Sequence, residues 1–151
     1  YRKSKEDFIL KRDAHMAIDK LEQYANDLKV VDDGEYGQFE YIIDLGKQTK
    51  SLDQKLCTED NQMYGCQAQV WIVCQKKGKQ YYYLGNSDAF IVKGLVAMMT
   101  QIFSGQNAKE IENFGPEMVN DLGLGPALTS RRQIGMMAMV KHIQKLAKEK
   151  R

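Results

Sequence analysis

The segment 89–103 constrains the fold most, because it is almost wholly apolar and yet too short to cross a membrane. Its most apolar part is interrupted by Lys93, whereas a membrane-spanning helix needs about 20 apolar residues. Ser87 or Asp88 can cap a helix at its start, and Ser104–Gly105 can end it. A helix that is apolar on every side must be covered on every side. We therefore expect this segment to be the central buried helix of a globular domain.

Before this helix, the composition changes to one typical of β-strands. The segment Gln67–Gln75 is dense in β-branched and aromatic residues, and Tyr81–Leu84 is similar after a lysine-rich turn. These two segments predict a β-hairpin. The segment Asn61–Tyr64 can supply a third short strand, with residues 65–66 in the bend that joins it to the hairpin.

Apolar residues at three- and four-residue spacing predict helices on both sides of the hairpin. The order of helices, strands and helices favours an α+β fold, with a small antiparallel three-stranded sheet covered by helices. At 151 residues, the chain fits one domain spanning 1–151. Besides 89–103, the expected helices are 4–28, a short one ending at Gly46, 107–114, 116–122, and a last one capped by Thr129 or Ser130 and running to about Lys148.

Charge and cysteine usage exclude several classes of function. Lys and Arg number 22 against 20 Asp and Glu, so the net charge of +2 predicts no partnership with nucleic acid or a membrane surface. The three cysteines form no C-x-x-C pair, so neither a disulfide framework nor a zinc ribbon is expected. We expect a soluble protein of a reducing compartment, either the cytoplasm or, in a eukaryote, an organelle stroma or matrix.

Cys66 is the candidate reactive residue. It follows Gly65, and glycine allows the tight or left-handed turn that holds a thiol at the tip of a loop. The thiolate of such a residue can attack the outer sulfur of a persulfide and later be attacked in turn, as in thiol–disulfide exchange, without a metal or an organic cofactor. The local sequence alone leaves a buried structural cysteine as the alternative.

A longer string around Cys66 narrows this choice. Residues 65–73 read Gly-Cys-Gln-Ala-Gln-Val-Trp-Ile-Val and resemble the active-cysteine segment of the SufE family of sulfur acceptors. The resemblance continues in 41–46, 85–95 and 128–132, in the order of the family, and covers about residues 36–148.

The resemblance implies both a fold and a role. SufE-like proteins have an α+β fold related to NifU-like scaffold proteins of iron–sulfur assembly. By this resemblance, Cys66 takes persulfide sulfur from a SufS-like cysteine desulfurase that uses pyridoxal phosphate, stimulates that enzyme, and passes the sulfur to a SufB-type scaffold complex. The protein would be a sulfurtransferase-type carrier and activator rather than a conventional enzyme. The persulfide would be carried covalently on Cys66, with no other cofactor and no metal.

The resemblance also implies supporting residues, which are Gly65 and Gln67 beside the thiol, Asp88 and Arg132. Asp88 matches a position that influences how readily the acceptor loop opens, and a helix N-cap is a compatible interpretation. Arg132 matches a family arginine that could favour the thiolate or contact the desulfurase, and the alternative is a solvated arginine in the first turn of a helix. Ile134 departs from the family, which usually has an amide side chain there.

Two alternatives remain at this stage. A SufE-like activator could deliver sulfur to another pathway, such as tRNA modification or the molybdenum cofactor. A metal or cluster scaffold could use Cys57, Cys66 and Cys74 together. Against the second alternative, Cys74 alternates with apolar residues on one strand face, as a core residue does. Cys57 lies in a polar connection, either as an idle surface thiol or as the partner of Cys66 in a regulatory disulfide.

Overall fold

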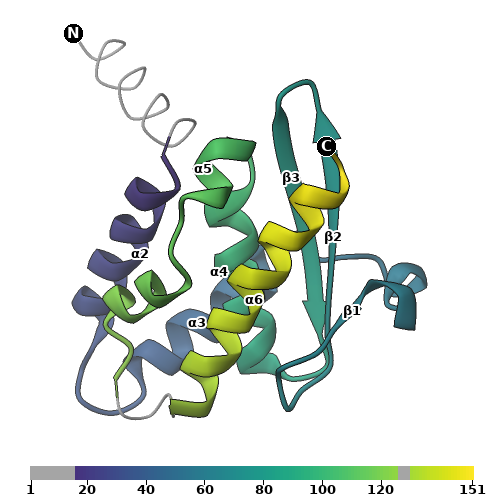
Figure 1. Cartoon of the computed structure of the whole chain (residues 1–151). Coiled ribbons are helices and arrows are strands. Elements are labelled where there is room, and N and C mark those ends of the chain that lie inside the picture. Colours follow the sequence, from purple (N-terminus) through teal and green to yellow (C-terminus); the bar gives the residue numbers. More distant parts are fainter. Residues whose placement is uncertain (1–15, 126–129) are drawn as a thin grey trace, which may run out of the picture.

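The computed structural model describes residues 16–125 and 130–151. Helices and a small sheet alternate along the chain, as Figure 1 shows. In chain order the elements are α2 Ala17–Val31, α3 Gly37–Gln48, the 3-10 helices η1 Gln54–Leu56 and η2 Glu59–Asn61, β1 Gln62–Met63, β2 Val70–Lys77, β3 Gln80–Ser87, α4 Phe90–Phe103, β4 Gln106–Asn107, α5 Ala108–Glu112, the 3-10 helix η3 Pro116–Leu122, and α6 Ser130–Glu149.

Helix α4 is the central element, which confirms the expectation from its composition. Eleven of its 14 residues are buried, because β3 packs on one side of it and α3 on the other. The approach to α3 is close enough that a Cβ added to Gly94 would lie 2.0 Å from the carbonyl oxygen of Ile42. The predicted cap is wrong, since the N-cap is Ala89 and no side chain caps the helix.

The sheet is antiparallel throughout, in the order β1-β2-β3-β4. Strands β2 and β3 form the expected hairpin, and β1 is the expected third strand. We did not expect β4, so the prediction of three strands is one too few. Gln106 pairs with Tyr81, and the Gly105 N–H donates to the Tyr81 carbonyl oxygen at 2.7 Å. A strand of two residues has no alternation that a sequence pattern could reveal.

The fold is layered, with α4 and α6 on the sheet and α2 and α3 behind α4 (Figure 1). Strand β2 turns Val70, Ile72 and Cys74 into the core, while α6 contributes an apolar stripe to it. This arrangement is the predicted α+β class. In the part of the chain that the structure describes, no helix combines the length and the apolar character needed to span a bilayer.

Within the described residues, the remaining helices overlap the segments predicted for them. Helix α5 begins at the predicted cap Asn107, whose Oδ1 accepts a hydrogen bond from the Glu110 N–H at 2.8 Å. The first helix was expected over 4–28; α2 matches its later part, and residues 1–15 lie outside the described residues. The predicted cap Thr129 also lies outside them, directly before α6.

Candidate functional site

Cys66 lies on the loop Tyr64–Gln69, which joins β1 to β2. Gly65 has a φ of +114°, in the region that favours glycine, and a Cβ added to it would lie 3.0 Å from the Cβ of Ala138 in α6. Glycine therefore allows both the bend and the close approach of the loop to α6. Gln67 is exposed, whereas Cys66 is half-buried.

The sulfur of Cys66 occupies space that a glycine of α6 leaves open. Its Sγ donates a hydrogen bond to the carbonyl oxygen of Gly135 at 3.7 Å, and a Cβ added to Gly135 would lie 3.1 Å from Sγ. A thiol is a weak donor, so this contact holds the sulfur less firmly than an ordinary hydrogen bond would. The docked position of the thiol thus depends on shape more than on bonding.

Burial raises the pKa of the Cys66 thiol above its ordinary value, because removal from water disfavours the charged thiolate. Loss of solvation is the cause of this shift. At neutral pH the docked thiol is therefore protonated.

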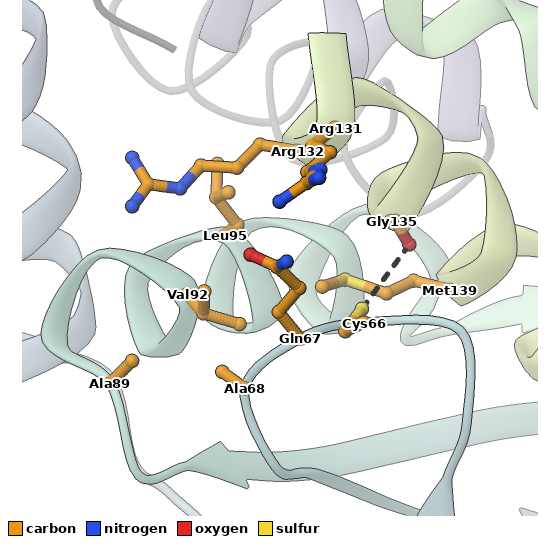
Figure 2. A pocket seen from close by; sticks show the side chains of 10 residues that line it. All are labelled: Cys66, Gln67, Ala68, Ala89, Val92, Leu95, Arg131, Arg132, Gly135 and Met139. Carbon is orange, nitrogen blue, oxygen red and sulfur yellow. Dashed lines mark hydrogen bonds between the residues drawn. The ribbon is translucent and has the colours of Figure 1, made fainter. Parts of the chain in front are cut away.

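A cavity of about 660 Å³ opens beside the thiol, between the loop, α4 and α6. Figure 2 shows Cys66 and Gln67 on the loop side, with aliphatic side chains of α4 behind them and two arginine side chains extending from α6 on the opposite side. The cavity is lined by Cys66, Gln67, Ala68, Ala89, Val92, Leu95, Arg131, Arg132, Gly135 and Met139.

Two cations therefore face the same space as the thiol. Arg131 and Arg132 both belong to the first turn of α6, and Arg131 is exposed. The guanidinium of Arg132 lies 5.7 Å from the centroid of the Phe39 ring, a distance typical of a cation–π contact. Within residues 16–125 and 130–151, neither arginine forms an ion pair. Ile134, which replaces the family's amide, is 63% exposed and does not line the cavity.

The far end of the loop is tied to the start of the α4 segment through Gln69. Its N–H donates to Asp88 Oδ1 at 3.0 Å, and its carbonyl oxygen accepts from Ser87 Oγ at 2.7 Å and from the Asp88 N–H at 3.4 Å. Asp88 is thus not the helix cap that the sequence suggested. Its carboxylate anchors the cysteine loop instead.

The other two cysteines lie elsewhere, and all three are free. Cys74 is 6% exposed in the core, as expected. The Sγ of Cys57 donates to the carbonyl oxygen of Asp53 at 3.6 Å, in the connection between α3 and β1. No group of three or more His, Cys, Asp or Glu side chains among the described residues is placed to hold a metal ion. Cys57, Cys66 and Cys74 therefore do not form the shared site that the scaffold hypothesis required.

The structure brings the sequence-predicted residues Cys66, Gln67 and Arg132 to one cavity, which several further residues also line. Arg131, Gly135 and Met139 follow one another at four-residue spacing, which puts them on one face of α6. That spacing was a usable signal. The contribution of α4 was not predictable, because its residues look like ordinary core residues in the sequence.

Comparison with known proteins identifies related chains over most of this length. A family model described as SufE, Fe-S metabolism associated domain, matches residues 22–147. An uncharacterized SufE-like protein of Rhizobium etli is 37% identical over 133 residues, covering 85% of this chain and 89% of the relative. One from Rhizobium meliloti is 34% identical over 129 residues, covering 82% and 91%.

Two more distant matches extend this comparison. An Arabidopsis thaliana protein named SufE-like protein 1, chloroplastic/mitochondrial, is 32% identical over 111 residues, which are 73% of this chain and 30% of that protein. The solution structure of a hypothetical protein from Thermus thermophilus superposes with a TM-score of 0.70 at 15% identity, covering 86% of this chain and 94% of the other. The second match shows that the two chains share a fold.

Proposed function

Because the chain belongs to the SufE family, a family associated with Fe-S metabolism, we propose that Cys66 is a sulfur acceptor. It takes persulfide sulfur from a SufS-like cysteine desulfurase and thereby stimulates that enzyme. It then passes the sulfur on to a SufB-type scaffold complex for cluster assembly. The single observation that carries this proposal is the thiol beside an open cavity, on a glycine-hinged loop.

The transfer consists of two displacements at sulfur. The Cys66 thiolate attacks the outer sulfur of the donor persulfide, so that a new S–S bond forms on Cys66 while the S–S bond of the donor breaks. The donor cysteine leaves as a thiolate and takes up a proton. The recipient thiolate then attacks the outer sulfur on Cys66 in the same way, and no electrons are gained or lost overall.

Because the docked thiol is protonated, sulfur loading favours movement of the loop. Since the thiolate is the nucleophile and burial raises the pKa of this thiol, loading is faster when the loop carries Cys66 into a less desolvated environment. Gly65 supplies the hinge for this motion, and the weak Cys66–Gly135 contact breaks at small cost. Asp88 holds the other end at Gln69, which limits how far the loop swings.

Gln67 and Arg132 have supporting roles in this proposal. Gln67 is exposed on the loop next to the thiol, where it can contact an incoming partner. Arg132 supplies positive charge on the opposite side of the cavity and attracts an anionic donor. Both side chains are accessible, so each can take part in docking without disturbing the core.

The test is sulfur loading in the presence of a SufS-like desulfurase and cysteine, read by intact mass. The wild-type chain should gain one sulfur mass, and peptide mapping should place it on Cys66. Desulfurase turnover should rise when the wild-type chain is added and should not rise with Cys66→Ser. The matched control is Cys57→Ser, which removes a half-buried thiol outside the cavity and should load normally. Loading of Cys66→Ser to the wild-type extent would refute the proposal.

A further inference from the structure

We propose that the cavity beside Cys66 also binds low-molecular-weight persulfides that carry a carboxylate, such as those of a cysteine derivative or a short peptide, and that Cys66 takes sulfur from them directly. This inference rests on the proposed function in one respect, namely that Cys66 is a sulfur acceptor. It adds a second class of donor, which needs no protein partner.

The size and lining of the cavity suit such a ligand. Its volume of about 660 Å³ falls within the usual range for small-molecule sites, roughly 300–1,000 Å³. One wall consists of apolar side chains, including Val92, Leu95 and Met139, which can cover the carbon skeleton of the ligand. Cys66 is itself one of the residues that line this cavity, so a persulfide bound there lies beside the thiol.

The charges in the cavity favour an anion. Arg131 and Arg132 line it, and none of its ten described lining residues is acidic. A planar guanidinium binds a carboxylate through two parallel hydrogen bonds. Within the described residues neither arginine has an acidic partner, so both are available to a ligand.

The position of these arginines at the start of α6 also favours an anion. The N-terminus of a helix carries partial positive charge, and acidic residues are the ones that stabilise it. The first turn of α6 contains no acidic residue and two arginines instead. This placement costs helix stability, but it adds the field of the helix terminus to that of the two guanidinium groups. The same end of α6 faces the cavity (Figure 2).

The reaction is a balanced sulfur transfer. The Cys66 sulfur forms a bond to the outer sulfur of the small persulfide, and the S–S bond of that persulfide breaks. The small thiol leaves with the proton that Cys66 gives up. One persulfide and one thiol are consumed and one of each is formed, so no oxidant or reductant is required.

The experiment uses the full chain without a desulfurase and two probes that differ in one charge, N-acetylcysteine persulfide and the persulfide of its methyl ester. The rate at which Cys66 gains one sulfur is followed by mass spectrometry with peptide mapping. The ratio of the two rates on the folded chain is divided by the same ratio on the urea-unfolded chain. This step removes the intrinsic difference in reactivity between the probes. We expect the folded wild-type chain to prefer the carboxylate probe by about tenfold, as a charge-assisted hydrogen bond supplies.

The variant Arg131→Gln/Arg132→Gln should lower this preference to about one. The matched control is Lys141→Gln/Lys148→Gln, which removes two exposed cations from the same helix outside the cavity and should keep the preference. Equal rates for the two probes on the wild-type chain, or an unchanged preference in the arginine variant, would overturn the inference.

A parallel reaction with desulfurase and cysteine separates this inference from the proposed function. If Cys66 loads from the desulfurase but not from either small probe, the inference is wrong and the proposed function stands. If Cys66 loads from neither kind of donor, the proposed function is wrong, and the inference with it.

Discussion

Cys66 and Cys74 lie eight residues apart in the sequence, and the fold gives them opposite environments. Cys74 is paired with Tyr83 across the β2–β3 hairpin and is 6% exposed, whereas Cys66 stands on a loop beside an open cavity. Burial raises the pKa of both thiols. The direction of the pKa shift therefore does not distinguish the two cysteines. They differ in how accessible the sulfur atom is.

The difference arises from what surrounds each sulfur. Around Cys74, ladder hydrogen bonds join β2 to β3, and the Tyr83 hydroxyl donates to the carbonyl oxygen of Ile143 in α6 at 3.0 Å. Around Cys66, the hydrogen bonds between the loop and other described residues are the weak contact with Gly135 and the anchor at Gln69. Exposing Cys74 requires part of the core to open, while exposing Cys66 requires only that one loop detach.

The largest expected effect is a difference in alkylation rate between these two thiols. Under native conditions, iodoacetamide should modify Cys66 at least about a hundredfold faster than Cys74, because exposing Cys74 costs several kcal/mol of local unfolding. Peptide mass spectrometry over a time course measures both rates. In urea the two rates should become similar, and native rates within a few-fold of each other would remove the contrast.

A pair of glycine substitutions compares how tightly the β2–β3 hairpin and the Cys66 loop are packed. A Cβ added to Gly85 of β3 would lie 2.4 Å from Val96 Cγ1 and 2.9 Å from the Trp71 carbonyl oxygen, so Gly85→Ala should cost about 1–3 kcal/mol of unfolding free energy. Gly135→Ala presses only on the Cys66 sulfur and replaces a helical glycine, so it should cost nothing and gain up to about 1 kcal/mol.

Chemical denaturation measures both variants, and alkylation adds a second readout. Cys66 in Gly135→Ala should react several-fold faster than in the wild type, since its docking space is reduced. A loss of stability in Gly135→Ala as large as that in Gly85→Ala would show that the loop is as rigid as the hairpin.

Removing the anchor of the loop should have a smaller effect. Asp88→Ala deletes the acceptor for the Gln69 N–H, a hydrogen bond with a net value of about 0.5–1.5 kcal/mol, so alkylation of Cys66 should accelerate by about two- to tenfold. The control is Asp53→Ala, which deletes a similar bond to the Lys55 N–H at 3.0 Å outside the cavity. An unchanged Cys66 rate in Asp88→Ala would mean that the anchor does not limit opening.

The smallest effect concerns alkaline pH and Cys74. A buried thiol has a higher pKa in the folded chain than in the unfolded chain, so above the unfolded pKa, roughly 8.5–9, the unfolded chain releases protons first. The contribution of the Cys74 thiol to the free energy of unfolding is therefore complete below the unfolded pKa. It is lost as the pH rises toward the folded pKa. Cys74→Val should flatten the decrease of unfolding free energy in this range, as urea titrations at several pH values would show. An identical pH profile in the variant would contradict the prediction.

Local sequence patterns predicted most of the fold because each depends on neighbouring residues. The apolar run 89–103 indicated the buried helix, and the β-branched segment 67–75 indicated the hairpin strand, since both periodicities follow from backbone geometry. Strand β4 was not predicted because its two residues pair with β3, from which α4 separates them in the sequence. The cap at Asp88 was misassigned, because Gln69 competes for its carboxylate and lies 19 residues away in the sequence.

The amino-acid sequence by itself determined most of the elements that form and which helix is buried, because composition and spacing along the chain carry that information. Only the tertiary structure decided that Cys66 is desolvated, that it fits against Gly135, and that Arg131 and Arg132 share its cavity. The physical reason is that solvation and charge in a cavity depend on distances through space, and these groups lie more than 60 residues apart along the chain.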